Sequence, residues 1–208
     1  VTVGVYQLET GKTIWLKTGT PKEKFLTNIS WSPDEQHIYI AELNREQNEM
    51  NLVCYSAVTG QKEGVLFPEK DEHYVEPQHP LLFLPNQPDQ FIWQSERDGY
   101  NHLYLYNTKG ELLKQLTKGD WVVMDVLGFD EKGENLFISS TQPSPISSFG
   151  PDHGPLSVKT WSLNLNKGKS TCLAKDAVLT GVHNTQLSGS GKYLLDNYSS
   201  WDIPRKIV

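Results

Sequence analysis

Cysteine is scarce in this sequence. Only Cys54 and Cys172 occur among the 208 residues, and they lie far apart along the chain. A disulfide framework needs more cysteines, and a structural zinc site needs closer spacing of its ligands. The sequence therefore predicts two buried residues that behave as small hydrophobic side chains, with a single disulfide as the alternative.

Long apolar runs are also missing. The longest is residues 81–84, whereas a membrane-spanning helix needs about 18 apolar residues or more. No membrane span is predicted in this segment. The sequence shows no signal peptide and begins at Val1, inside an expected strand, rather than at Met. We therefore expect a processed product or an expressed fragment.

Positive charge is in short supply. Lys and Arg number 19 against 25 Asp and Glu, which gives a net charge of −6, and no basic stripe is visible. Binding to nucleic acid needs clustered Lys and Arg, so no nucleic-acid partner is predicted. Hydrophobic residues make up 37% and aromatic residues 11% of the chain, enough for a packed core.

The most informative stretch of the sequence is residues 90–121. Strand formers at 91–93, 103–106 and 112–116 alternate with two glycine-containing turns, at 96–99 and 107–110. Three strands joined by short turns predict an antiparallel meander. A unit this small cannot bury both of its faces, so similar units should pack against it.

Such units recur along the chain. An apolar residue followed by a polar turn and a second apolar strand begins at Trp31, Phe83, Phe129 and Leu187. A repeat of about fifty residues with four strands in each is typical of a β-propeller blade. In residues 103–106 leucines occupy one face and tyrosines the other, which favours a strand buried on both sides.

The fold class predicted is all-β, a partial β-propeller of about four blades with four antiparallel strands in each. The expected divisions are two strands in 1–20, blades in 26–67, 81–117 and 122–174, and the start of a blade in 184–208.

The stretch 90–121 resembles the N-terminal propeller of the dipeptidyl peptidase IV family, serine peptidases of the prolyl oligopeptidase clan. Segments 29–34 and 196–199 are consistent with this resemblance. The residues that identify the family are structural ones: Trp93, Glu96, Arg97, Asp98, Gly99, His102, Leu103, Tyr104, Gly119 and Trp121.

The resemblance implies a longer parent protein. In the family an eight-bladed propeller caps an α/β-hydrolase domain, and the pair removes dipeptides with Pro or Ala second from peptide N-termini. The resemblance places the catalytic Ser, Asp and His in the hydrolase domain, and the Glu-Glu pair that grips the substrate amine before the equivalent of Val1. It also implies a periplasmic, secreted or cell-surface parent. The family's aromatic-Arg pair is not evident in residues 74–79.

No catalytic, substrate-binding or metal-ligating residue is predicted in this chain, and no cofactor. The segment 188–191 is the nearest match to a Gly-x-Ser-x-Gly elbow, but its spacing is wrong and it lies between two strands. The cluster Asp71, Glu72, His73, Glu76 and His79 could be considered for a metal, but it occupies a proline-containing loop, which favours a solvated charged surface.

The remaining candidates for chemistry have plainer interpretations. The turn at 96–99 could be a recognition loop, but it suits a hairpin in which Gly99 takes a positive φ and Asp98 bonds its own backbone. His102 is expected to pack rather than to act as a base. The long loop 142–157 could gate access, form a dimer contact or be a tolerated insertion, and its Asp152-His153 pair has no visible serine partner.

The function expected is therefore that of a non-catalytic propeller segment of a dipeptidyl peptidase IV-like exopeptidase, inactive alone. Its partners would be the hydrolase domain and peptide substrates of the parent. Uncovered blade faces predict homo-oligomers. The alternative is a stand-alone four-bladed propeller that serves as a binding scaffold, closed by pairing its first and last strands.

Overall fold

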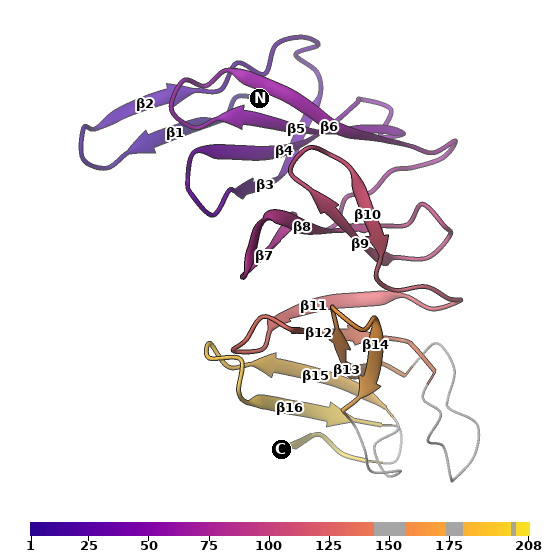
Figure 1. Cartoon of the computed structure of the whole chain (residues 1–208). Coiled ribbons are helices and arrows are strands. Elements are labelled where there is room, and N and C mark those ends of the chain that lie inside the picture. The colour runs from indigo at the N-terminus through magenta and orange to yellow at the C-terminus, as the bar shows by residue number, and fades with distance from the viewer. Residues whose placement is uncertain (144–156, 174–180, 201–202) are drawn as a thin grey trace. The chain divides into compact units, whose positions relative to one another are not determined.

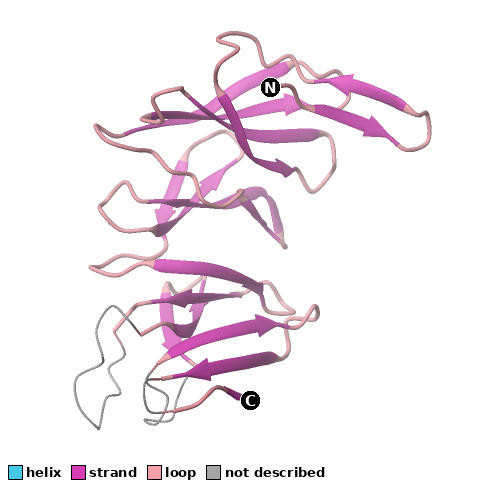
Figure 2. Cartoon of the chain, turned by 180° about the vertical axis from the view of Figure 1, so that it is seen from behind, coloured by secondary structure: helices cyan, strands magenta, loops and turns pink. Residues whose placement is uncertain are grey.

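A computed structural model describes residues 1–143, 157–173, 181–200 and 203–208. In these residues the regular structure consists of β-strands joined by turns and loops, with no helix (Figure 2). Most of the 142–157 loop, including the Asp152-His153 pair, lies outside the described residues. The predictions for that loop therefore stay predictions.

The first half of the chain forms a hairpin and two four-stranded sheets (Figure 1). In both sheets each strand lies beside the next strand in sequence, and the pairs β3–β4, β4–β5, β5–β6, β7–β8 and β9–β10 are antiparallel. The strands are β1 (Gly4–Gln7) and β2 (Lys12–Trp15); β3 (Phe25–Trp31), β4 (His37–Leu43), β5 (Glu49–Ser56) and β6 (Lys62–Lys70); and β7 (Leu82–Leu84), β8 (Gln87–Ser95), β9 (His102–Asn107) and β10 (Leu112–Gln115).

The second half repeats this arrangement with a four-stranded and a three-stranded sheet. The strands are β11 (Val123–Phe129), β12 (Asn135–Ser140), β13 (Lys159–Asn164) and β14 (Lys169–Cys172), then β15 (Val182–Leu187), β16 (Leu194–Ser199) and β17 (Lys206–Ile207). Antiparallel four-stranded sheets made of consecutive strands are the blades of a propeller. The predicted all-β fold class is confirmed.

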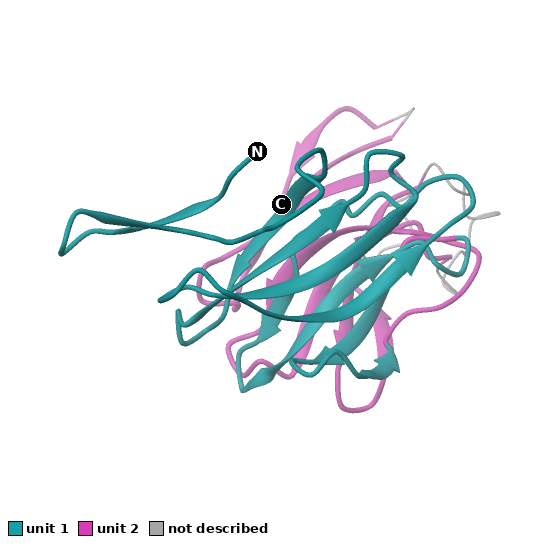
Figure 3. Ribbon diagram, turned by 90° about the horizontal axis from the view of Figure 1, so that it is seen from above, with its two compact units in different colours: residues 1–99, 103–115 teal, residues 100–102, 116–208 magenta. Residues whose placement is uncertain are grey.

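The chain divides into two compact units, coloured separately in Figure 3. Unit 1 comprises residues 1–99 and 103–115, and unit 2 comprises residues 100–102 and 116–208.

The core of unit 1 explains why its strands are apolar on both faces. Tyr39 and Ala41 of β4 face a large cluster shared with β8 and β9, whereas Ile38 and Ile40 face a second cluster. Because side chains alternate along a strand, β4 is buried on both sides. In the large cluster Tyr106 stacks on Phe67, with ring centroids 4.2 Å apart.

Unit 2 has its own apolar core. It is centred on the middle strands β12 and β13, where Leu136, Ile138, Trp161 and Leu163 are almost completely buried. Ile138 and Trp161 are cross-strand partners, as are Leu136 and Leu163. Direct cross-strand pairing of large apolar side chains stabilises the central ladder of the sheet.

The end predicted for the first full blade is wrong. The blade expected over 26–67 extends three residues further, because β6 continues through Pro68 to Lys70. Proline is tolerated there because β6 is the outermost strand of its sheet and needs no donor on its free side. In the next blade, residues 85–86 alone connect β7 to β8, since β8 begins at Gln87.

Both cysteines are buried, and neither forms a disulfide. Cys54 lies in β5 of unit 1, and Cys172 ends β14 of unit 2. The prediction of two buried residues is confirmed, and the disulfide alternative is excluded.

Candidate functional site

The charged turn of the predicted meander connects β8 to β9. Gly99 adopts φ +97°, and its N–H donates to the carbonyl of Glu96 at 2.8 Å. A positive φ is readily available to glycine, so the turn prediction is confirmed. Asp98 does not cap its own backbone as expected. Its carboxylate instead accepts a 2.6 Å hydrogen bond from Gln115 Nε2, which fastens the turn to β10.

Arg97 extends from this turn across the blade interface of unit 1. Its guanidinium donates to the Glu69 carboxylate on β6 and lies 4.4 Å from the centre of the Tyr104 ring. Glu69 also accepts the indole N–H of Trp93 at 3.0 Å. The Arg97 charge is therefore paired and stacked on an aromatic face. This residue joins two blades.

His102 is completely buried at the start of β9. Its Nε2 lies 2.9 Å from the carbonyl oxygen of Gly119, and its Nδ1 lies 3.0 Å from Thr117 Oγ1. A carbonyl can only accept, so Nε2 carries the proton and Nδ1 accepts from the threonine hydroxyl. With both nitrogens engaged and no solvent contact, His102 packs the structure and is not placed to act as a base.

Gly119 and Trp121 complete this arrangement in unit 2. The Trp121 ring lies edge-on to His102, with centroids 4.8 Å apart. Gly119 has φ +137°, and a Cβ at this position would lie 2.4 Å from Trp121 Nε1. Only glycine fits there, which explains the Gly-Asp-Trp sequence in physical terms.

An open pocket of about 490 Å³ lies at one end of the two blades of unit 1. We call it the loop-end pocket. Its walls are the end of β6, the loop 71–81 and the β8–β9 turn, and its lining includes Glu69, His73, Tyr74, Glu76, Glu96 and Arg97. Tyr74 is strongly exposed there, with 74% of its surface accessible.

The loop-end pocket is acidic. Glu69 is paired with Arg97, and Lys70, which also lines the pocket, is paired with Glu49. Asp71, Glu76 and Glu96 line the space as well, and Asp71 Oδ1 lies 3.5 Å from His73 Nδ1. The His73 backbone N–H donates to Asp71 at 2.8 Å and holds the pKa of that carboxyl below its usual value. Asp71 therefore stays ionised at neutral pH. The arrangement suits a positively charged group rather than an anion.

The loop 71–81 is fixed to the rest of its blade. The N–H groups of Asp71 and Val75 donate to the carbonyls of Asn48 and Gln47, at 3.1 and 2.8 Å. Further along, Asn28 Nδ2 donates to the carbonyls of Pro77 and His79. The loop therefore has a defined course.

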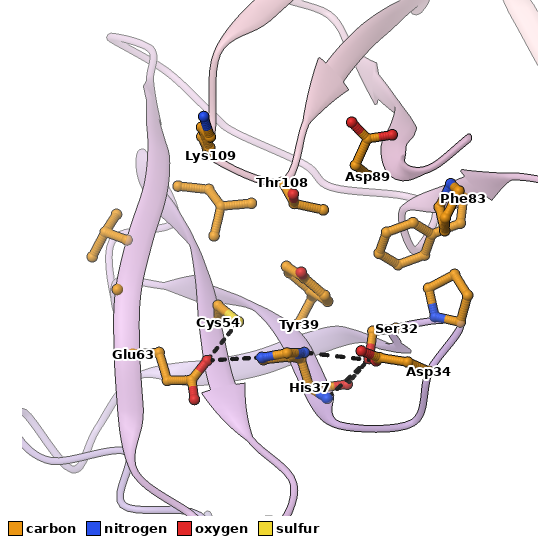
Figure 4. A pocket seen from close by; sticks show the side chains of 15 residues that line it. Ser32, Asp34, His37, Tyr39, Cys54, Glu63, Phe83, Asp89, Thr108 and Lys109 are labelled. Atoms are coloured by element: carbon orange, nitrogen blue, oxygen red, sulfur yellow. Dashed lines mark hydrogen bonds and ion pairs between the residues drawn. The ribbon is translucent and has the colours of Figure 1, made fainter.

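Figure 4 shows a second pocket, of about 570 Å³. Its lining residues lie at the opposite end of the same strands. This turn-end pocket is lined by the β3–β4 and β9–β10 turns. His37 lies between two carboxylates, with Nε2 3.2 Å from Glu63 and Nδ1 3.7 Å from Asp34. The Cys54 thiol donates to Glu63 over 3.7 Å.

The side chains of the turn-end pocket are not activated for catalysis. Burial, followed by the Glu63 carboxylate, raises the pKa of the Cys54 thiol to about 12. A nucleophilic cysteine needs the opposite shift, because only the thiolate attacks. Asp34 accepts from the Ser32 hydroxyl, which keeps its pKa low. These groups satisfy one another.

The segment 188–191 is a hairpin turn between β15 and β16. The Gly191 N–H donates to the Ser188 carbonyl at 2.9 Å, and the Ser188 N–H donates to the Tyr193 carbonyl at 2.8 Å. Because a nucleophile elbow joins a strand to a helix, this turn does not have that geometry. Among the described residues no group of three or more His, Cys, Asp or Glu is placed to hold a metal ion.

Sequence reasoning missed one buried polar pair in unit 2. His183 is 3% exposed, its Nδ1 lies 2.6 Å from Asp196 Oδ2, and its ring stacks on Tyr198. Thr185 donates to the other oxygen of Asp196 at 3.0 Å. The available signal was an i, i+2 spacing, which puts side chains on the same face of a strand. His183 and Thr185 have this spacing on one strand, and Asp196 and Tyr198 have it on the other.

Comparison with known proteins identifies this architecture. The family model for the dipeptidyl peptidase IV (DPP IV) N-terminal region matches residues 1–205. This chain belongs to the dipeptidyl peptidase IV family. The resemblance read from residues 90–121 is thereby confirmed.

Relatives of the DPP IV N-terminal region include the "Probable dipeptidyl-aminopeptidase B" of Arthroderma gypseum, 29% identical over 180 residues. That alignment covers 80% of this chain and 18% of the relative. The "Probable dipeptidyl peptidase 4" of Emericella nidulans is 26% identical over 218 residues, which cover 98% of this chain and 26% of the relative.

Solved structures give the same family. A crystal structure from Bacteroides ovatus, described as a "putative dipeptidyl aminopeptidase IV", is 38% identical with a TM-score of 0.85, and covers 99% of this chain and 30% of its own. Porphyromonas gingivalis dipeptidyl peptidase 4 is 22% identical with a TM-score of 0.81, covers 99% of this chain and 27% of its own, and shows the shared fold. This DPP IV segment thus spans less than a third of each relative.

The described residues contain no helix that could cross a membrane.

Proposed function

We propose that this chain is the non-catalytic propeller segment of a serine exopeptidase that removes N-terminal dipeptides with Pro or Ala second. In the parent it supports an α/β-hydrolase domain and forms a wall of the chamber that admits peptide ends. The family match over residues 1–205 carries this proposal. Residues 188–191 form a hairpin turn between two strands, and in this proposal the catalytic Ser belongs to the hydrolase domain of the parent.

The loop-end pocket is our candidate for the surface that faces the peptide. The N-terminus of a peptide substrate carries a positive charge, and Asp71, Glu76 and Glu96 give the pocket the complementary sign. They would add to the attraction of the Glu-Glu pair that the resemblance places before Val1. Tyr74 adds an exposed aromatic surface. In this proposal the residues select and orient substrate, and bond cleavage belongs to the hydrolase domain.

A cleavage assay tests the proposal. Full-length protein should release nitroaniline from Gly-Pro-p-nitroanilide, and a serine-directed inhibitor should block this release. The isolated segment 1–208 should show no turnover. Turnover by the isolated segment that the inhibitor blocks would contradict the assignment of catalysis to another domain.

The gene sequence beyond Val208 discriminates between the peptidase and the stand-alone scaffold. A Gly-x-Ser-x-Gly elbow within about two hundred codons, between a predicted strand and helix, supports the peptidase. A stop codon directly after this segment supports a small binding propeller. The share of the relatives that the chain covers, 18% to 30%, favours the longer parent.

We further propose that the parent works in the periplasm, outside the cell or at the cell surface, without a cofactor, and as a homo-oligomer.

The isolated segment should self-associate through large exposed side chains of its first hairpin. Tyr6 and Trp15 are 60% and 61% exposed. Sedimentation velocity over a range of concentrations measures this, and a strictly monomeric profile at high concentration argues against it.

A further inference from the structure

Asn28 occupies an unusual backbone position in the first strand of its blade. Between Thr27 and Ser30 the pairing of β3 with β4 shifts, so that Asn28 and Ile29 lie opposite Ile40 alone. This is a β-bulge, and Asn28 adopts φ +53° in it. Glycine is the usual residue at a left-handed bulge position, because it has no Cβ to strain the backbone.

Glycine would occupy this position with less strain, but asparagine adds a side-chain amide that forms hydrogen bonds. Asn28 Nδ2 donates to the carbonyl of His79 at 2.7 Å and to that of Pro77 at 3.0 Å. Its Oδ1 accepts from the Thr27 hydroxyl at 2.8 Å, which fixes the orientation of the amide. A single side chain on β3 therefore binds two carbonyls about fifty residues away.

The loop needs such a donor. Pro77 and Pro80 lack backbone N–H groups, so this part of the chain is poorly suited to forming a ladder of its own. Carbonyl groups in such a segment require donors from elsewhere, and Asn28 supplies them. Ser30 adds a weaker bond, 3.3 Å long, to the carbonyl of Leu81.

The anchored loop is a wall of the loop-end pocket, to which it contributes Tyr74 and Glu76. We propose that Asn28 is a positioning residue: it touches no substrate, but it fixes the 71–81 loop so that these side chains meet the peptide. This inference rests on the proposed function, in which the loop-end pocket faces substrate. Misplacing binding groups weakens substrate binding even when the catalytic groups are intact.

Two substitutions in the full-length protein test this role. Asn28→Gly keeps the left-handed backbone accessible and removes only the side chain. Asn28→Asp keeps the shape, replaces the donor with an acceptor and brings a carboxylate against two carbonyls. Glu35→Gly is the matched control, because Glu35 also has a positive φ, of 59°, but lies exposed in the β3–β4 turn.

We expect both Asn28 variants to raise KM for Gly-Pro-p-nitroanilide about fivefold, the effect of losing about one hydrogen bond, with kcat within about twofold of wild type. Hydrogen exchange at the Val75 amide of the loop, which donates to the carbonyl of Gln47 between β4 and β5, should become about tenfold faster. Glu35→Gly should change neither quantity.

The outcomes separate the two proposals. A wild-type protein that does not cleave the substrate refutes the proposed function. Wild-type cleavage with an unchanged KM in Asn28→Gly overturns the positioning role. Unchanged exchange at Val75 in both variants overturns the anchoring itself, whatever the kinetics show.

Discussion

The two pockets of unit 1 are similar in size but differ in how they are built. The turn-end pocket is bordered by short turns, and its charged groups, Asp34, His37 and Glu63, interact with one another. The loop-end pocket is bordered by a long loop held by tertiary hydrogen bonds, and carboxylates beyond the Arg97–Glu69 pair line it. The difference teaches that pocket volume does not identify a binding site, whereas an excess of carboxylates beside an anchored loop does suggest one.

The largest effect should come from removing the buried indole that hydrogen-bonds Glu69 of the loop-end pocket. Trp93 is completely buried and donates to Glu69, so Trp93→Ala should lower the free energy of unfolding by about 3–5 kcal/mol. Urea denaturation followed by circular dichroism measures this. Tyr193→Ala is the control, because Tyr193 is 74% exposed and its loss should cost less than about 0.5 kcal/mol. Equal losses in the free energy of unfolding from the two substitutions would show that the buried indole beside the loop-end pocket does not stabilise the blades.

A smaller effect is expected from the ion pair that links the blades. The Glu69 side chain is only 12% exposed, and Glu69→Ala would leave Arg97 without its carboxylate and Trp93 without its acceptor. We expect a loss of about 2 kcal/mol in the free energy of unfolding. Glu49→Ala breaks the exposed pair with Lys70 and should cost less than about 1 kcal/mol. A Glu69 variant as stable as the Glu49 variant would show that the pair does not join the blades.

The smallest effect concerns pH and the turn-end pocket. The pKa of Cys54 is raised from 9.0 to about 12 in the folded chain, so the folded state holds its proton more tightly than the unfolded state. This contribution to stability is complete below about pH 9 and is lost as pH rises toward 12. Alkylation of Cys54 by iodoacetamide at pH 8 should be slow in native protein and fast in urea. Rapid native alkylation, located by peptide mass mapping, would mean that this pocket holds a reactive thiol.

The blades themselves could be predicted from the sequence because their signals are local. The turn at 96–99 and the alternation in 103–106 lie within a few residues of the strands they define. The predicted end of β6 was too early because proline usually ends a strand. Pro68 is tolerated within β6 only because β6 is the edge strand of its sheet.

The loop-end pocket could not be predicted in the same way. Arg97 meets Glu69, and Asn28 meets Pro77 and His79, only after separate strands have packed. Neither the sequence spacing of these residues nor their types predicts these contacts. Asn28 reads as an ordinary polar residue in a strand, and its left-handed backbone becomes visible only through the shift in pairing with β4.

Consecutive pairing of strands has a consequence for how the protein is made. Each strand of a blade finds its partner one turn or loop along the chain, so closing a blade costs little loop entropy. The sheet β3–β6 can assemble while the ribosome is still translating β7, at a synthesis rate of about 5–20 residues per second. The apolar face that β4 and β5 present to the next blade is then exposed only for the few seconds needed to deliver β8 and β9.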